Sequence, residues 1–396
     1  MNYLTQIFAI TMMSLSTIKE RLGSTLVIVA GTAGVVAVLV SMLALSNGVR
    51  QTISSVGRDE RAVVVNKGAT SAAGSNIPRD AVLTVLDKPG IMRGTDGKLL
   101  ATSDAIASLW LPHINEPTPG SVTLRGVTPD GIAVRPEITL TAGRMFTPGL
   151  RQVIVGEAVT RSYAHLDVGD KIVANGIEWE VVGNFKSGGN LHESEIWSDA
   201  ESVLAAFHRN SFNTVTVWVG NEAGFNTLKQ ALDADPTLTV DLHTEKEFYN
   251  SQSSGFSTFL AIVGKAVGGI MAVGAIFGSI NAMYTAVSAR TGEIATLRAI
   301  GFGASGVVVS VFVEAMLLAL AGALVGSALA WLLFNGNSIS TVAGNSGLAQ
   351  VVFDLHVNLA VVLQGIEWAL ILGLIGGLLP AIRAARLPVV VALRGA

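Results

Sequence analysis

Four long apolar segments divide the chain, and the polar stretches between them set its organisation. They cover residues 24–46, 256–287, 307–334 and 359–382, and each holds a run with few charged residues. A helix that rises 1.5 Å per residue needs about 20 apolar residues to cross a hydrocarbon core of ~30 Å. The pattern therefore predicts four transmembrane helices.

The first segment has a competing interpretation, and the second is longer than one membrane crossing needs. A secretory signal peptide is the competing interpretation of 24–46, since Ala44 and Ser46 stand at small-residue cleavage spacing. The apolar run is too long for a signal peptide and about 20 residues precede it, so we predict an uncleaved anchor. The second segment exceeds one crossing, and we place its membrane part at 266–287, with Lys265 at the outer interface and a stalk before it.

Residues 1–22 precede the first span. Their apolar positions recur at helical spacing, and three charged residues at positions 19–21 mark the end of this pattern. We predict a cytoplasmic-side amphipathic helix lying in the membrane interface. The alternative is that these residues form the first turns of the membrane helix.

Residues 47–255 hold no spanning segment, and they carry most of the prolines and several Asp-Gly or Asn-Gly turns. The pattern predicts an α+β domain, of two lobes, inserted between the first and second spans of an α-helical membrane protein. Asn175-Gly176 predicts a hairpin. The predicted strands are 62–65, 122–124, 153–155, 171–173, 178–182 and 214–219, and the predicted helices are 157–166, 200–207 and 223–234.

Basic residues set the orientation. Seven basic residues near the membrane segments fall on one side of a four-span topology: Lys19, Arg21, Arg290, Arg298, Arg383, Arg386 and Arg394. The opposite loop, 335–358, has no Lys or Arg. Because short cytoplasmic loops are enriched in basic residues, we expect both termini, the 383–396 tail and the 288–306 segment to be cytoplasmic. The large domain and the 335–358 loop are then extracytoplasmic.

The segment 288–306 is too polar for hydrocarbon and too short for a domain. Ile294, Leu297 and Ile300 recur at helical spacing, Arg290 and Glu293 can pair, and Gly301 is placed to cap a helix. A helix this short is marginal alone in water, so we infer that something packs on it. An ordinary interfacial loop helix is the alternative.

Glu293 to Gly301, E-I-A-T-L-R-A-I-G, resembles the E-I-x-x-L-R-A-x-G signature of MacB/FtsX/LolC-type ABC permeases. Two further runs carry the resemblance. Residues 143–185 resemble the MacB-type extracytoplasmic domain, and 380–394 resemble the family's closing motif with one extra residue before Ala392. In that family the short helix couples the permease to its ATPase. The residues this implies are Arg290, Glu293, Ile294, Leu297, Arg298, Ile300 and Gly301.

The resemblance also implies partners and a location. We expect a multi-pass protein of the bacterial inner membrane, in contact with membrane lipids, that pairs with a second permease copy, identical or related. Two ATPase subunits would hold ATP and Mg²⁺, with no cofactor on this chain. The expected function is mechanotransmission, which exports or extracts a lipophilic or amphipathic substrate. The alternative is an FtsX-like regulator of a cell-wall hydrolase, and a periplasmic adaptor and an outer-membrane component stay open.

Several polar residues and glycines stand out in the spans. Glu314 and Glu367 are costly in hydrocarbon, so each is a functional-site hypothesis, with helix-to-helix fixing as the alternative to substrate movement. Asn281 and Lys265 are the other polar candidates. Small residues four apart let helix backbones approach closely. These pairs are Gly264/Gly268, Gly274/Gly278, Gly322/Gly326 and Gly373/Gly377.

Composition excludes much else. The chain has 396 residues, 50% hydrophobic and 14% charged, with a net charge of −3 and no cysteine. Disulfides, thiolate metal sites and a basic nucleic-acid surface are excluded. No P-loop motif occurs, and G-x-G-x-x-G at Gly301, Gly303 and Gly306 lacks a βαβ context. His192, Glu193 and Glu195 are interpreted as a solvated loop, not a metal site. We expect no active site on this chain.

Overall fold

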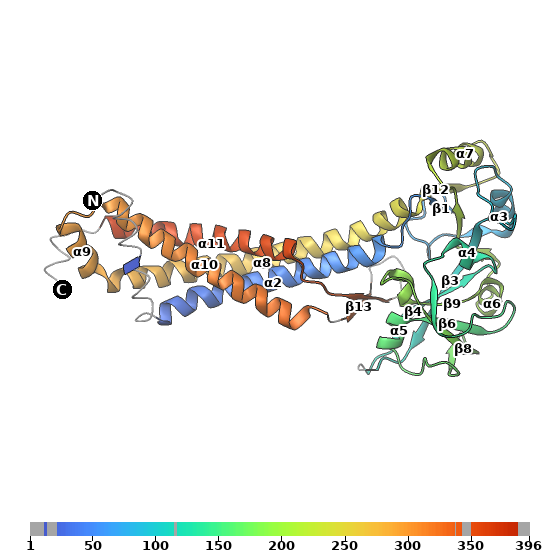
Figure 1. Ribbon diagram of the computed structural model, residues 1–396, viewed down its shortest axis with the longest axis horizontal. Coiled ribbons are helices and arrows are strands. Elements are labelled where there is room, and N and C mark those ends of the chain that lie inside the picture. The colour runs from blue at the N-terminus through green and yellow to red at the C-terminus, as the bar shows by residue number, and fades with distance from the viewer. Residues whose placement is uncertain (1–11, 14–21, 115–116, 337, 343–349, 387–396) are drawn as a thin grey trace. The chain divides into compact units, whose positions relative to one another are not determined.

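The computed structural model describes residues 12–13, 22–114, 117–336, 338–342 and 350–386 (Figure 1). Most of the predicted interfacial helix at 1–22 and most of the 383–396 tail lie outside them. The described chain forms two compact units. One contains most of the apolar helices, and the other contains residues 47–258 together with 338–354.

Within the described residues, four helices are long and apolar enough to cross a membrane. They are α2 (Leu22–Ser54), α8 (Glu245–Ala289), α10 (Ala304–Phe334) and α11 (Leu359–Ala385), and the short α9 (Thr291–Ala299) follows α8. The four-helix plan with a large α+β domain between the first and second is confirmed. In the helical unit, α2, α8, α10 and α11 run alongside one another (Figure 1).

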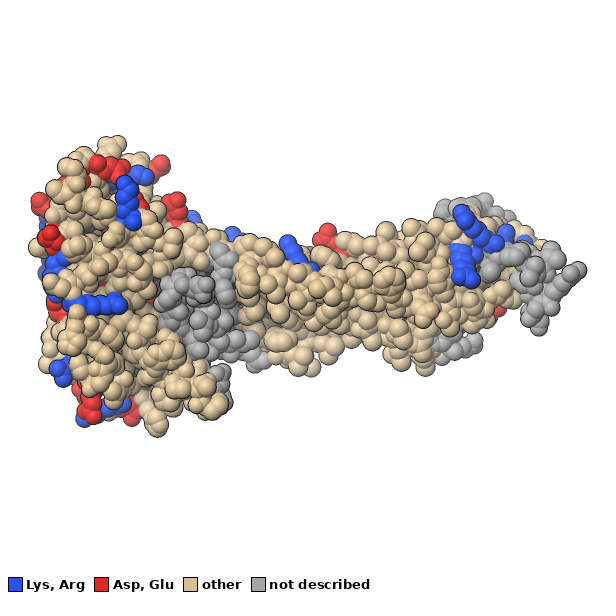
Figure 2. Space-filling model, turned by 180° about the vertical axis from the view of Figure 1, so that it is seen from behind, with Lys and Arg blue, Asp and Glu red and all other residues tan. Residues whose placement is uncertain are grey.

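Small and branched apolar side chains fill the space between these helices. One cluster joins α8, α9 and α10 to α11 and includes Met283, Val311 and Ala381. A second cluster joins α2, α10 and α11. On the face seen in Figure 2, charged side chains are sparse along the middle of the helical unit. This distribution suits a bundle surrounded by hydrocarbon.

The large domain is built on a ten-stranded sheet of order β12-β1-β11-β3-β4-β9-β6-β8-β5, with β7 also paired to β8. The sheet strands are β1 (Arg61–Asn66), β3 (Ala101–Leu111), β4 (Gly120–Val127), β5 (Thr139–Gly143), β6 (Gln152–Gly156), β7 (Lys171–Ala174), β8 (Ile177–Lys186), β9 (Glu195–Asp199), β11 (Thr214–Trp218) and β12 (Val240–Thr244). β3 serves both halves of the sheet, because its first residues pair with β11 and its last with β4. These ten strands therefore form one continuous sheet.

Short helices pack on this sheet or connect its strands. They are α3 (Arg79–Leu86), α4 (Gly131–Val134), α5 (Glu157–Ser162), the 3₁₀ turn η2 (Leu191–Ser194), α6 (Ala200–Ala206) and α7 (Glu222–Asp233). A two-residue pair joins β2 (Ile77–Pro78) to β10 (Ser211–Phe212). The main core takes its largest buried aromatic side chain, Trp179, from β8.

The predicted hairpin at Asn175-Gly176 is confirmed. β7 and β8 pair antiparallel with Ala174 opposite Ile177, and both turn residues have positive φ, 50° and 75°. Two positive φ values are what a type I′ hairpin turn requires, and Asn-Gly tolerates them best. The predicted helix at 157–166 is four residues too long, since α5 ends at Ser162 and Tyr163 is extended.

Two expected boundaries differ in the structure. The second membrane helix begins at Glu245, eleven residues before the expected 256, because Phe248 and Tyr249 bury their rings. The expected loop 335–358 contains an antiparallel hairpin of β13 (Ser338–Val342) and β14 (Gln350–Asp354). This hairpin belongs to the large domain, where β14 lies against β4, α5 and η2.

Candidate functional site

The coupling segment is a short helix closed at its end. Arg290 is the single residue between α8 and α9. At the other end Gly301 has φ of 100°, the Phe302 N–H donates to Leu297 O and the Gly301 N–H to Arg298 O. This is a Schellman motif, and a glycine takes the left-handed position without a Cβ clash. The predicted capping role of Gly301 is confirmed.

The apolar stripe of α9 does not face in one direction. Ile294 is buried and packs in the cluster that includes Met283 and Val311, whereas Leu297 is half-buried. Ile300, by contrast, is 68% exposed. The surface that α9 can offer to another protein therefore lies at its C-terminal end.

The two arginines of the coupling segment, Arg290 and Arg298, contact α10 and α11. Arg290 is 8% exposed, its Nε lies 3.0 Å from a Glu293 oxygen, and its Nη1 lies 3.6 Å from Glu314 Oε2 on α10. At the other end of α9, Arg298 Nη1 donates to the Ala385 carbonyl at 3.0 Å. Of the implied coupling residues, Arg290 and Ile294 are thus placed inside the bundle.

The polar residues of the spans divide into two kinds. Glu314 is 5% exposed and paired with Arg290, which favours a helix-fixing role over substrate movement. Glu367, Lys265 and Asn281 are exposed on α11 and α8. We assign Glu367 no part in coupling.

Three of the four glycine pairs lie against another helix. A Cβ on Gly326 would come within 2.4 Å of Ala33 O, and one on Gly377 within 2.5 Å of the Ala315 Cβ. Such glycines let the helix backbones approach closely. Gly264, Gly268, Gly322 and Gly373 also meet neighbouring helices. Gly274 and Gly278 have nothing within 4 Å among the described residues.

The sequence did not indicate a buried junction where α2 and α8 enter the large domain. Arg61, 0% exposed, donates from Nε to Glu245 Oε2 at 2.6 Å and from Nη2 to Glu137 Oε1 at 2.8 Å. Gly57 also requires its small size, because a Cβ there would come within 2.3 Å of Lys246 Cα. The end of α2 and the start of α8 are therefore fixed to each other and to the domain.

A second buried charge cluster lies in the middle of the sheet. Arg125 on β4 donates through two nitrogens to Glu195, each at 2.7 Å, and through Nη1 to Asp104 at 2.9 Å. Arg135 donates to the same Asp104 oxygen at 2.7 Å. Two cations thus balance two carboxylates, which is what buried charges require.

His192 completes this cluster. Its Nδ1 lies 3.0 Å from Glu195, and its Nε2 has no hydrogen-bond partner among the described residues. Burial lowers the pKa of His192, and Arg125 lowers it further against the opposing effect of Glu195. Burial alone would raise the pKa of Glu195, but Arg125 and His192 hold it well below the usual value. The prediction of a solvated loop here is wrong, since His192, Glu193 and Glu195 are all buried.

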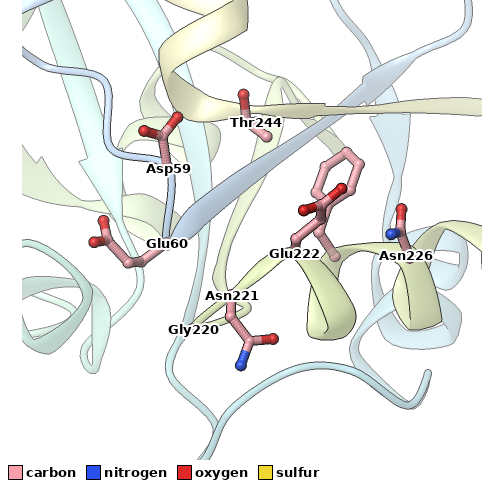
Figure 3. A pocket seen from close by; sticks show the side chains of 8 residues that line it. Asp59, Glu60, Gly220, Asn221, Glu222, Asn226 and Thr244 are labelled. Carbon is pink, nitrogen blue, oxygen red and sulfur yellow. The ribbon is translucent and has the colours of Figure 1, made fainter.

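A surface pocket of about 490 Å³ opens beside the stalk junction (Figure 3). Asp59, Glu60 and Glu222 stand around it, with Phe225 among the other lining residues. Among the described residues, no group of three or more metal-ligating side chains could hold a metal ion. The lining of the pocket is thus acidic, with the carboxylates of Asp59, Glu60 and Glu222.

Two family profiles match this chain. The MacB-like periplasmic core domain matches residues 25–235, more than half of the chain, and the FtsX-like permease C-terminal domain matches 265–389. Together they extend from α2 to the C-terminal end of α11.

Individual relatives agree. An uncharacterized ABC transporter permease, YknZ of Bacillus subtilis, is 24% identical over 401 residues and covers 96% of each chain. The macrolide export ATP-binding/permease protein MacB of Shewanella oneidensis is 25% identical over 402 residues, and the chain spans 57% of it. The chain thus spans little more than half of that MacB.

Two solved structures are similar to parts of the chain. The extracellular domain of YknZ has a TM-score of 0.36 at 15% identity and covers 46% of this chain and 99% of its own. The periplasmic region of MacB from Actinobacillus actinomycetemcomitans has a TM-score of 0.37 at 16% identity. The match covers 50% of this chain and 94% of the MacB structure.

Proposed function

Because this chain belongs to the family with a MacB-like periplasmic core domain and an FtsX-like permease domain, we propose that it transmits motion across the membrane. It is a permease subunit of an ABC transporter, which is supported by its similarity to the ABC transporter permease YknZ and to the ATP-binding/permease protein MacB. ATP hydrolysis on a partner ATPase would move α9, and α8 would pass the movement to the large domain. A lipophilic or amphipathic substrate would then be exported or extracted outside the membrane.

One observation carries this proposal: α8 is a single helix of 45 residues between the domain and the coupling helix. At 1.5 Å per residue it is about 67 Å long, more than twice a hydrocarbon core of ~30 Å. Its first residue, Glu245, is ion-paired with Arg61 inside the domain. One residue after its last, α9 begins. A continuous helix held at one end and attached to α9 at the other can carry a displacement.

The exposed end of α9 supports a partner on that side. Ile300 is 68% exposed and lies beside half-buried Leu297, which gives a small apolar contact for an ATPase subunit. ATP and Mg²⁺ would bind to that subunit and not to this chain. We place two ATPase copies in the assembly.

A second permease copy, identical or related, is proposed on α8. Gly274 and Gly278 are open on the same helical face as Phe277, which is 68% exposed. Small residues beside a large aromatic ring suit close helix packing in a membrane. Both termini would be cytoplasmic and the large domain extracytoplasmic, in the bacterial inner membrane.

The test is a pair of substitutions on α9. We expect Leu297→Asp and Ile300→Asp to abolish ATP-driven coupling while the permease stays folded, because a charge replaces each apolar contact. Leu83→Asp is the matched control, since Leu83 is an equally exposed apolar residue, 69%, on α3 of the large domain. Copurification and turnover of the ATPase are measured for all three. Normal turnover in the α9 variants would refute the coupling assignment.

A further inference from the structure

We propose that Arg290 is a positioning residue that joins α9 to α10 through Glu314, so that movement of the coupling helix reaches the third span directly. The inference rests on the proposed function and assigns one step of it. It also gives Glu314 a role, as the residue on α10 that receives this movement.

The connection between α8 and α9 needs such a support. Arg290 is the single residue between the helices, and its backbone angles, φ −108° and ψ 13°, are those of a bend. A one-residue bend transmits force in a defined direction only if its geometry is fixed. The side chain of the same residue supplies that support, since it holds Glu293 on α9 at 3.0 Å and approaches Glu314 on α10 at 3.6 Å.

The environment makes this connection strong. Arg290 is 8% exposed and Glu314 is 5% exposed. Opposite charges attract far more strongly away from water, so separation of this buried pair is costly. Arg290 therefore cannot move away from α10 without a large penalty. Its burial also argues against direct contact with an ATPase.

A second contact acts at the far end of the coupling helix. Arg298 donates to the Ala385 carbonyl near the end of α11, at 3.0 Å. α11 in turn packs closely on α10, because Gly373 and Gly377 lie against Ala319 and Ala315. Each end of α9 is thus attached by an arginine to the α10–α11 pair. The three helices should move as one body.

The chain's lack of cysteine permits a direct test. In Arg290→Cys/Glu314→Cys, the ion pair is lost and we expect ATP-driven coupling to fall at least tenfold. A bis-methanethiosulfonate linker between the two thiols should restore most of the coupling, and reduction should remove it again. A merely structural role would not give this reversible rescue. A linked protein that stays uncoupled would overturn the proposal.

A second pair of variants tests the proposed role of the Arg290–Glu314 pair even if the double-cysteine protein does not fold. Glu314→Gln preserves the side-chain shape and should reduce coupling several-fold, whereas Glu367→Gln, an exposed glutamate on α11, should not. Normal coupling in Glu314→Gln would refute the relay. If Leu297→Asp uncouples the ATPase but Glu314→Gln does not, the relay alone is wrong. If neither uncouples it, the proposed function itself fails.

Discussion

Replacement of Arg61 by methionine should loosen the attachment of the end of α2 and the start of α8 within the large domain. The Arg61 guanidinium lies within 2.6 Å of Glu245 and 2.8 Å of Glu137, and it donates to the carbonyls of Val134 and Val56 at 2.9 and 3.1 Å. Methionine keeps most of the side-chain length but none of these bonds. Glu245 then loses its buried ion-pair partner, and Glu137 keeps only Arg58 among the described residues, at 3.9 Å.

The magnitude follows from burial. Arg61 and Glu245 are each 0% exposed, and Glu137 is 12% exposed at its side chain. Removal of one partner from a buried ion pair costs about 3–5 kcal/mol. Because about 1.4 kcal/mol is a factor of ten in an equilibrium constant, local opening should become roughly two to three and a half orders of magnitude more frequent.

This local opening can be measured by hydrogen exchange and mass spectrometry on the full chain in nanodiscs. Peptides from the end of α2 and the first turns of α8 should exchange faster in Arg61→Met. Lys246→Met is the matched control, since Lys246 and Asp59 form the neighbouring pair at 2.7 Å with 52% and 67% exposed side chains. An exposed pair contributes about 0–1 kcal/mol, so the control should change exchange by less than about tenfold.

Two results would refute this reasoning. Equal acceleration in Arg61→Met and Lys246→Met would show that burial does not determine the contribution of these pairs. Unchanged exchange in Arg61→Met would show that the junction is held by other contacts, such as the close approach of Gly57 to Lys246.

Three further outcomes are expected. Because the pKa of His192 is lowered in the folded domain, the unfolded chain binds a proton there more readily than the folded domain does. The stability of the domain should therefore fall as pH drops below about 6.5. His192→Gln should make this fall in stability smaller, as measured by hydrogen exchange. Gly326→Ala should cost about 1–3 kcal/mol and lower the thermal midpoint, whereas Gly23→Ala, where a Cβ would meet nothing within 4 Å among the described residues, should leave it unchanged. Phe277→Cys should form cross-links between copies in membranes, and its failure to do so would place that face of α8 against lipid.

The features that the sequence revealed are those with a strong local signal. Continuous apolar runs marked all four spans, because a membrane helix must be apolar over its whole crossing. Asn175-Gly176 marked a hairpin, and Gly301 marked a helix end, because both depend on backbone angles that few residues tolerate.

The features that it did not reveal depend on distant partners. β3 was not predicted, since a buried Asp104 interrupts its pattern, and the guanidinium groups of Arg125 and Arg135 that compensate it lie far along the chain. The first ten residues of α8 are mostly polar, although Glu245 pairs with Arg61 at a separation of 184 residues. No local pattern shows that such charges are buried.

The coupling helix has features of both kinds, some predictable from the sequence and some not. Its residues and its end at Gly301 were recognisable, but the direction of each side chain was not. Helical spacing places Ile294, Leu297 and Ile300 on one stripe, yet the structure buries the first and exposes the last. The pairing of Arg290 with Glu314 across 24 positions could not be read from either segment alone.

The most direct test of the account measures movement of the large domain. A spin label on Leu83→Cys labels one exposed site on α3, since the chain has no other thiol. Double electron–electron resonance then measures the distance between the labels on two copies of the domain. With the thiols of the copurified ATPase blocked, ATP should change this distance, and Leu297→Asp should abolish the change. A distance that ATP leaves unchanged, or a change that survives Leu297→Asp, would contradict transmission through the coupling helix.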